Sequence, residues 1–241
     1  MRLIASVVAA GLILAGCSTA DSKDIRTSGI KADLLVTVKD HDRRAELLAT
    51  LRAGTLTYVK LGDDEAINVS SSDSSTELRR NKSLGVTNYS GRLEGELRAG
   101  TEVTFDLRRD SNNESAPHST VSLPERLQLI APAVGTTASR QSPITVRFES
   151  GPTDLPTTVS WSGSCIQNGE FQLPSGGVVT HIPAGRIKPT AVSPSAGQSA
   201  DTSCTVRIKV FRRATGALDP AYKEGSIVAE AQSFRDITSI P

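Results

Sequence analysis

Hydrophobic residues fall on every second position along several stretches of this chain, and this period constrains the fold more than any other feature. The even positions from Ile30 to Val38 are all apolar, and the pattern returns from Cys204 to Val210. Alternate residues of a strand share one face, so the period predicts strands with one face in a core and the other in water. We therefore expect an all-β protein.

Turn residues separate these stretches and predict how the strands connect. Residues 30–38 and 45–51 are expected to form a hairpin across a polar turn, although the second arm taken alone also fits a helix. Residues 93–97 and 103–107 are expected to form another hairpin across a glycine turn. The remaining expected strands are 55–61, 66–69, 120–123, 127–130, 144–148, 159–161, 178–182, 186–188 and 226–237.

Many short strands punctuated by Pro and Gly are typical of β-sandwiches. We predict two tandem antiparallel β-sandwich domains, residues 29–125 and 126–241, with a boundary near Pro124. The second half resembles Ig-like or fibronectin-type domains, with Trp161 close to a cysteine. Cys165 follows this tryptophan, whereas in antibody domains the first cysteine precedes it, so the resemblance implies architecture only.

The first sixteen residues have the order of a secretory signal peptide. Arg2 gives a positive start, residues 3–14 are apolar except for Ser6 and Gly11, and small residues follow. A resident membrane-spanning helix needs about 20 apolar residues, so this run is too short to be one. We expect residues 1–16 to be cleaved off.

Leu14-Ala15-Gly16-Cys17 resembles the lipobox of bacterial lipoproteins. The resemblance implies cleavage between Gly16 and Cys17, and acylation of Cys17 with chains such as palmitate. Each buried methylene adds about 0.8 kcal/mol, so several chains would anchor the protein on a membrane. Ser18 stands where an aspartate would imply inner-membrane retention, so the resemblance favours the outer membrane. Residues 17–28 are polar and are predicted to be a lipidated tether; the alternative is a signal with an incidental cysteine.

Two cysteines remain beyond the anchor, Cys165 and Cys204, an even pair in an exported chain. Oxidising compartments favour disulfides, so we expect these two residues to be bonded. The chain has no CxxC motif and no histidine beside either cysteine, which argues against a zinc site. No metal and no cofactor are expected.

Charge and motifs exclude several functions. The formal net charge is +1 and only 4% of residues are aromatic, so no nucleic-acid partner is expected. His41 lies between Asp40 and Asp42, but adjacent residues of a hairpin point to different sides, which indicates a solvated turn. His118 follows a polar loop without the glycine of a calcium loop, and His181 belongs to no motif. With no nucleophile elbow either, we predict no enzyme activity and no catalytic residue.

The connection before the last expected strand carries a possible binding loop, formed by Leu218, Pro220 and Tyr222. Loops at the end of a sandwich often form binding surfaces, and tyrosine is a favoured anchor. The alternative interpretation, which we favour, is that Pro220 and Tyr222 pin a long connection against its own strands.

These observations predict a lipid-anchored protein of the cell envelope that acts by non-enzymatic binding or structural contact. Its partners would be the membrane, through the anchor, and an envelope protein or glycan. One alternative is an accessory subunit of an export or adhesion assembly. Another is a weak envelope glycan hydrolase, which would require two carboxylates converging in a groove.

Overall fold

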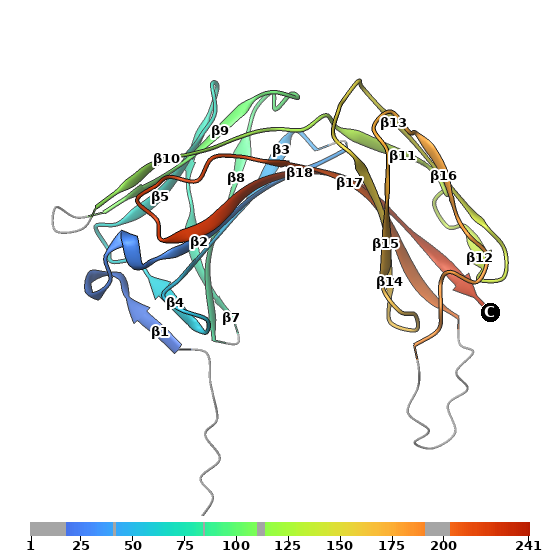
Figure 1. Cartoon of the computed structure of the whole chain (residues 1–241), viewed down its shortest axis with the longest axis horizontal. Helices are drawn as coiled ribbons and strands as arrows, with labels where there is room; N and C mark the ends of the chain where they lie inside the picture. The colour runs from blue at the N-terminus through green and yellow to red at the C-terminus, as the bar shows by residue number, and fades with distance from the viewer. Residues whose placement is uncertain (1–17, 41, 84, 110–113, 191–202) are drawn as a thin grey trace, which may run out of the picture.

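The computed structural model describes residues 18–40, 42–83, 85–109, 114–190 and 203–241. Gly16 and Cys17, the predicted cleavage and lipidation residues, lie outside the described residues. The regular elements of the described chain are all strands apart from two short 3₁₀ helices, η1 (Ser22–Asp24) and η2 (Thr27–Gly29). The predicted all-β fold with Ig-like sandwiches is confirmed, and Figure 1 shows the two sandwiches as the arms of an arch.

Three sheets build the arch. The largest has eleven strands and runs through both arms, a four-stranded sheet covers it in the first arm, and a three-stranded sheet covers it in the second. The long sheet contains β1 (Ser18–Asp21), β2 (Lys31–Lys39), β3 (Arg44–Arg52), β4 (Thr57–Lys60), β7 (Arg79–Ser83), β8 (Val86–Glu94), β12 (Thr137–Ser139), β14 (Thr157–Gly163), β15 (Gly169–Leu173), β17 (Cys204–Thr215) and β18 (Glu224–Ile240). The four-stranded sheet contains β5 (Ala66–Ser70), β6 (Ser75–Glu77), β9 (Glu102–Arg108) and β10 (Ala116–Ser122). The three-stranded sheet contains β11 (Leu127–Ala131), β13 (Ile144–Ser150) and β16 (Val179–Ile182).

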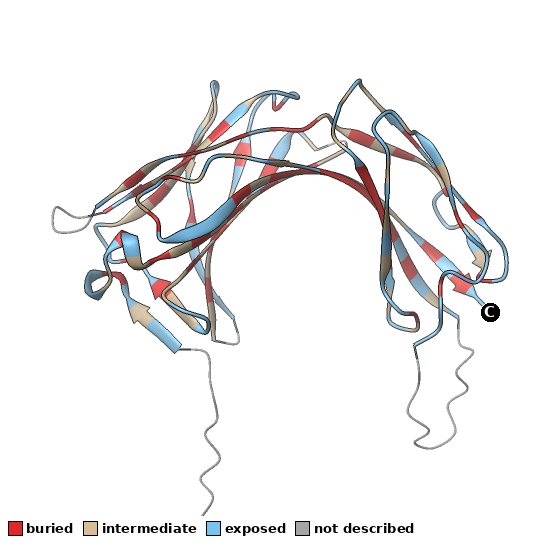
Figure 2. Ribbon diagram, in the orientation of Figure 1, coloured by how far each residue is buried: buried red, intermediate tan, exposed pale blue. Residues whose placement is uncertain are grey.

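Each arm has its own hydrophobic core, coloured as buried in Figure 2. In the first, the inward side chains of β2 and β3 face those of the four-stranded sheet, including Phe105 at 1% exposure. In the second, Trp161 and the inward side chains of β17 face Phe148 from the three-stranded sheet. Alternation of apolar residues therefore produced the strand faces that the sequence predicted.

The last strand belongs to both cores. Ile227, Ala229 and Ala231 lie in the first core, whereas Ile237 lies in the second. At about 3.3 Å per residue, the 17 residues of β18 reach about 56 Å, which is long enough to cross from one sandwich to the other. The predicted division placed all of residues 126–241 in the second domain, but the first half of β18 completes the first core.

Strand pairing agrees with the prediction in part. β2 and β3 form the expected hairpin, with Leu34 opposite Ala49. Three pairings are parallel, β18 with β2, β1 with β4 and β12 with β18, in addition to the expected antiparallel ones. The parallel pair of β18 and β2 arises because β17 brings the chain back to the first arm, where β18 begins beside β2 before it runs to the second arm.

Two expectations about individual strands are wrong. Residues 93–97 and 103–107 do not form a hairpin, because Leu93 lies on β8 in the long sheet while β9 pairs with β5 and β10 in the covering sheet. Their apolar side chains meet across the core rather than along a ladder. Residues 186–188 are not a strand; Ile187 is a single buried side chain in an irregular connection.

The predicted tether is folded onto the first sandwich. Ser18–Asp21 forms β1 beside β4, and Ser22 and Thr27 are buried. The segment is polar because it is fixed by hydrogen bonds rather than by apolar contacts, and such a pattern has no periodicity for sequence analysis to detect.

Candidate binding surface

The junction between the arms is cross-linked by side chains. The Ser233 hydroxyl donates to Asp40 Oδ2 at 2.8 Å and accepts from the backbone N–H of Leu129 at 3.0 Å. Arg235 Nη2 donates to the carbonyl oxygen of Leu129 at 2.9 Å. These bonds join β18 to the turn after β2 and to β11, so the junction is held by both arms.

Arg126 fastens the same junction from the linker. Its guanidinium donates to the carbonyl oxygens of Lys39, Asp42 and Leu97, at 2.5, 2.7 and 3.2 Å. Burial lowers the pKa of Arg126, and the nearby Asp42 and Asp40 charges oppose that shift. Together with β17 and β18, which run between the arms, these contacts join the two sandwiches directly, so they are not two domains connected only by a flexible linker.

One face of the long sheet is covered by the two smaller sheets, and no described segment forms a second layer over its other face. This open face lines the concave side of the arch (Figure 1). The side chains on it are those that alternate with the core positions. Across five strands one row reads Thr215, Val228, Leu35, Leu48 and Ser90. The central three are half-buried apolar residues, which give the open face an apolar stripe near its middle.

Two phenylalanines lie on the open face where β17 and β18 cross between the arms. The Arg207 guanidinium lies 4.2 Å above the centre of the Phe234 ring and is paired with Asp236 at 2.8 Å. The hydrogen bond and charge of Arg207 lower the pKa of Asp236. Phe234 is half-buried, and the cation above its ring contributes about 0.5–1 kcal/mol at an exposed site.

Phe211 is enclosed by two cations. Lys209 Nζ and the Arg213 guanidinium lie 4.5 and 4.6 Å from its ring centre, and only 5% of the residue is exposed. Both cations also bind Glu230, at 2.6 and 2.8 Å. The open face at the crossing is therefore a network of rings and paired charges, with little net charge.

A cavity of about 690 Å³ lies at the crown, between the turn after β2 and the segment after β8. Four carboxylates line it, from Asp40, Asp42, Glu94 and Glu96. Each is occupied by hydrogen bonds or ion pairs: Asp40 by Ser233, Asp42 by the backbone N–H of Arg44, Glu94 by the Arg44 side chain and Glu96 by Arg98. The cavity therefore collects charges that are already paired.

A second cavity, of about 500 Å³, opens at the side of the second sandwich where β15 and β16 are edge strands. Phe171 and Pro183 line it together with His181, Arg186 and Lys188. Phe171 packs against Trp161 with ring centres 6.1 Å apart, which links this cavity to the second core.

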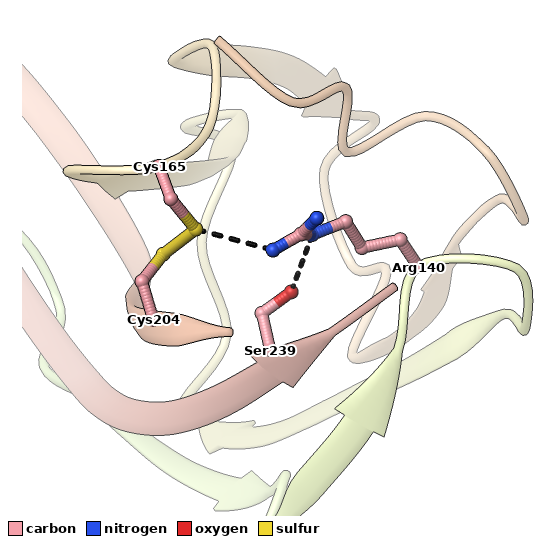
Figure 3. The surroundings of a disulfide bond; sticks show 4 residues. All are labelled: Arg140, Cys165, Cys204 and Ser239. Atoms are coloured by element: carbon pink, nitrogen blue, oxygen red, sulfur yellow. Dashed lines mark hydrogen bonds between the residues drawn. A yellow bond between two sulfur atoms is a disulfide. The ribbon is translucent and has the colours of Figure 1, made fainter. Parts of the chain in front are cut away.

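The predicted disulfide is present. Cys165 and Cys204 are bonded, with their Cα atoms 5.9 Å apart and 39 positions apart in sequence. Figure 3 shows Arg140 reaching over the bond: its Nη2 lies 3.1 Å from Cys165 Sγ, and its Nε donates to Ser239 Oγ at 3.1 Å. The bond thus ties β17 to the connection after β14, and its two half-buried cysteines lie beside an arginine.

The possible binding loop is turned inward. Tyr222 is 7% exposed and belongs to the first core, Leu218 packs partly buried against it, and Pro220 is exposed. Burial raises the pKa of the Tyr222 hydroxyl, with the Asp219 charge acting in the same direction. The favoured interpretation, a connection pinned by Pro220 and Tyr222, fits the buried Tyr222 but not the exposed Pro220.

The other sequence candidates do not converge. His41 lies outside the described residues, while the backbone N–H of His118 donates to Asp219 and His181 pairs with Thr145 on the neighbouring strand. Among the residues that the structure describes, no group of three or more His, Cys, Asp or Glu is placed to hold a metal ion.

Sequence reasoning missed the buried arginines. Arg109 has a fully buried side chain and binds Glu65 at 2.9 Å, the carbonyl oxygens of Ser22 and Ile25, and the Thr27 hydroxyl. Arg212, 1% exposed, donates to Thr157 and Ser150, and burial lowers its pKa. In a sequence, a buried arginine cannot be told from an exposed one, because charged residues are usually on the surface. The burial of Arg109 and Arg212 becomes visible only from their hydrogen-bond partners, which are distant in sequence.

Comparisons with known proteins identify no family. No family model and no curated protein matches the chain. Among solved structures, the chain is similar to the chicken CNTN1 FN1-FN3 domains, with 10% identity and a TM-score of 0.29 over 94% of this chain and 69% of that one. It is also similar to DIP-gamma IG1+IG2, with 6% identity and a TM-score of 0.23 over 87% of this chain and 97% of that one. A third match, Dpr11 IG1 bound to DIP-gamma IG+IG2, has 9% identity and a TM-score of 0.24 over 88% and 99%.

These scores are low, so the description of the fold rests on the chain's own sheets and cores. Within the described residues, no helix is both long and apolar enough to cross a bilayer.

Proposed function

We propose that this protein is a lipid-anchored, non-enzymatic binding module of the cell envelope, and that the open concave face of its long sheet contacts a partner. The observation that carries the proposal is the open face itself, which continues across both arms without a second layer among the described residues. A rigid junction favours such a role, because a preorganised surface avoids ordering costs on binding.

The chemistry of this face favours a protein partner over a glycan. Sugars stack on free aromatic faces, but cations cover Phe234 and Phe211. Paired charges around a half-buried aromatic and an apolar stripe resemble the mixture at protein interfaces, where aromatic residues and arginine are enriched. We therefore place the partner among envelope proteins, which includes the alternative of an accessory subunit.

The anchor rests on the sequence. Cys17 follows the lipobox-like residues directly, and acylation there would concentrate the arch at an envelope membrane, the outer membrane if the cell is Gram-negative. Cys17→Ser should release the protein from the membrane fraction. Retention of this variant on membranes would contradict the anchor.

The binding face is tested by site-specific photocrosslinking in cells. A photoreactive residue is placed at Phe234, on the open face, or at Val134, which is 82% exposed in the second arm. We expect a discrete protein adduct from position 234 that is absent from position 134. The same adducts from both positions, or adducts to glycan alone at position 234, would contradict the proposal.

A further inference from the structure

We infer that the β1 end of the first sandwich lies directly on the bilayer, with Leu56 at the lipid interface; this placement rests on the proposed anchor at Cys17. The start of β1 carries the argument. Ser18 already pairs with Thr57, its backbone N–H donates to the Leu56 carbonyl oxygen at 3.1 Å, and its hydroxyl lies 2.8 Å from that of Thr57. Neighbouring Cα atoms are about 3.8 Å apart, so an acylated Cys17 would lie within one residue's length of the start of β1.

The segment that follows β1 is fixed to the sandwich, so it does not act as a flexible spacer between the anchor and the sandwich. The fully buried Arg109 binds the carbonyl oxygens of Ser22 and Ile25 and the Thr27 hydroxyl at 2.7–3.0 Å. Glu65 accepts hydrogen bonds from the Ser22 hydroxyl and from the Arg109 guanidinium. Acyl chains on Cys17 would therefore hold the sandwich itself, rather than a flexible tether, against the membrane.

An independent observation lies at the same place. Leu56 is 48% exposed, and among the described residues of the first sandwich it is the only large apolar side chain that is exposed. It sits in the turn between β3 and β4, next to Ser18. Moving this leucine from water into a membrane interface would be favourable. The leucine and the attachment point thus coincide.

The placement also orients the arch. Figure 1 shows β1 at the free end of the first arm, on the side toward which the concave face opens. With β1 on the bilayer, the open face of the long sheet points toward the membrane. The partner of the proposed function would then be a membrane-embedded or membrane-bound protein that lies beneath the arch.

Spin labelling tests the placement on the full lipidated protein in vesicles of phosphatidylethanolamine and phosphatidylglycerol. Because Cys165 and Cys204 are bonded and Cys17 would be acylated, an introduced cysteine is the only free thiol. Leu56→Cys carries the label, and Val134→Cys is the matched control in the second arm. We expect vesicles to lower collisions of the position 56 label with a water-soluble nickel chelate several-fold and to raise its collisions with oxygen, with no change at position 134.

A spacer variant separates contact from attachment. About ten Gly and Ser residues inserted between Cys17 and Ser18 span about 16–19 Å on average, and should return position 56 to its value in water while the protein stays on vesicles. If the native protein sediments with vesicles but position 56 keeps its aqueous collision rates, the placement is overturned and the anchor stands. If it does not sediment, both are overturned.

Discussion

The two sandwiches are closed by different chemistry. In the first, a buried ion pair between Arg109 and Glu65 fixes the N-terminal segment to the sandwich. In the second, the Cys165–Cys204 bond, beside Arg140, ties β17 to the connection after β14. A buried ion pair depends on both partners and on pH, whereas a disulfide depends on the redox compartment. One sheet thus joins two units whose stabilities respond to different conditions.

Intrinsic chromophores separate the two units. The chain has one tryptophan, Trp161, in the second core. Its three tyrosines, Tyr58, Tyr89 and Tyr222, all belong to the first sandwich. Trp fluorescence therefore follows the second unit and tyrosine near-UV circular dichroism the first, so the unfolding of each unit can be followed separately.

The largest effect is expected from Arg109→Ala. Removing one partner of a buried pair leaves Glu65 as an uncompensated charge, which costs about 3–5 kcal/mol. Urea unfolding should show this loss in the tyrosine signal of the first sandwich. The control is Arg108→Ala, because Arg108 is exposed and its pair with Asp106 contributes less than about 1 kcal/mol. Equal losses of stability in the two variants would contradict a stabilising role for the buried Arg109–Glu65 pair.

Removal of the disulfide should cost somewhat less. Cys165→Ser with Cys204→Ser opens a loop of 39 residues, and native disulfides typically contribute about 2–4 kcal/mol. We expect the tryptophan transition to shift to lower urea while the tyrosine transition shifts less, and reduction of the native protein should reproduce the change. Equal shifts in both signals would instead show that the long sheet makes the arch a single cooperative unit.

The junction is expected to contribute less again. Ser233→Ala removes the hydroxyl that binds Asp40 and leaves the Leu129 N–H unpaired, which should cost about 1–3 kcal/mol. Because this serine joins the arms, tyrosine and tryptophan transitions should separate further than in the native protein. The control is Ser226→Ala on the same strand, where the residue is exposed and no separation is expected. Transitions that stay together would show that β17 and β18 alone couple the arms.

Acid should distinguish the two arms by how steeply each loses stability as the pH falls. Burial alone would raise the pKa of Glu65, but hydrogen bonds from Ser22, Gly62 and Arg109 and the Arg109 charge lower it below its ordinary value of 4.5. A lowered folded-state pKa stabilises the protein above the unfolded value, and this stability is lost as the pH falls through the folded pKa. The pKa of Asp236 is also lowered, but its pair is exposed and screened.

We therefore expect acidification below about pH 4.5 to destabilise the tyrosine transition more steeply than the tryptophan transition. Glu65→Gln should flatten the slope of the tyrosine signal. An unchanged slope in that variant would assign the acid sensitivity to other carboxyls.

The sequence predicted what is local and missed what is distant. The β2–β3 hairpin follows from alternation and a nearby turn, and the disulfide follows from cysteine count and compartment. The hydrogen bond from Arg109 to the Ser22 carbonyl oxygen joins residues 87 positions apart, and no periodicity in the sequence encodes such a bond. The crossing strand β18 was expected as a strand, but its role in both cores depends on length and curvature, which alternation does not specify.

The smallest effect is expected on the open face itself. Arg207→Ala removes a bidentate pair with Asp236 and the cation above Phe234, but the side chains are 50% and 42% exposed, so the loss of stability should be about 0.2–1 kcal/mol. If Arg207 served mainly the fold, its removal would lower the free energy of unfolding by more than this. If it serves binding, its removal would weaken the contact with the partner while the fold stays intact. The same variant should therefore reduce the position 234 photoadduct while leaving the tryptophan transition nearly in place. A large loss of stability with an unchanged adduct would make Arg207 a structural residue and remove the aromatic crossing from the binding face.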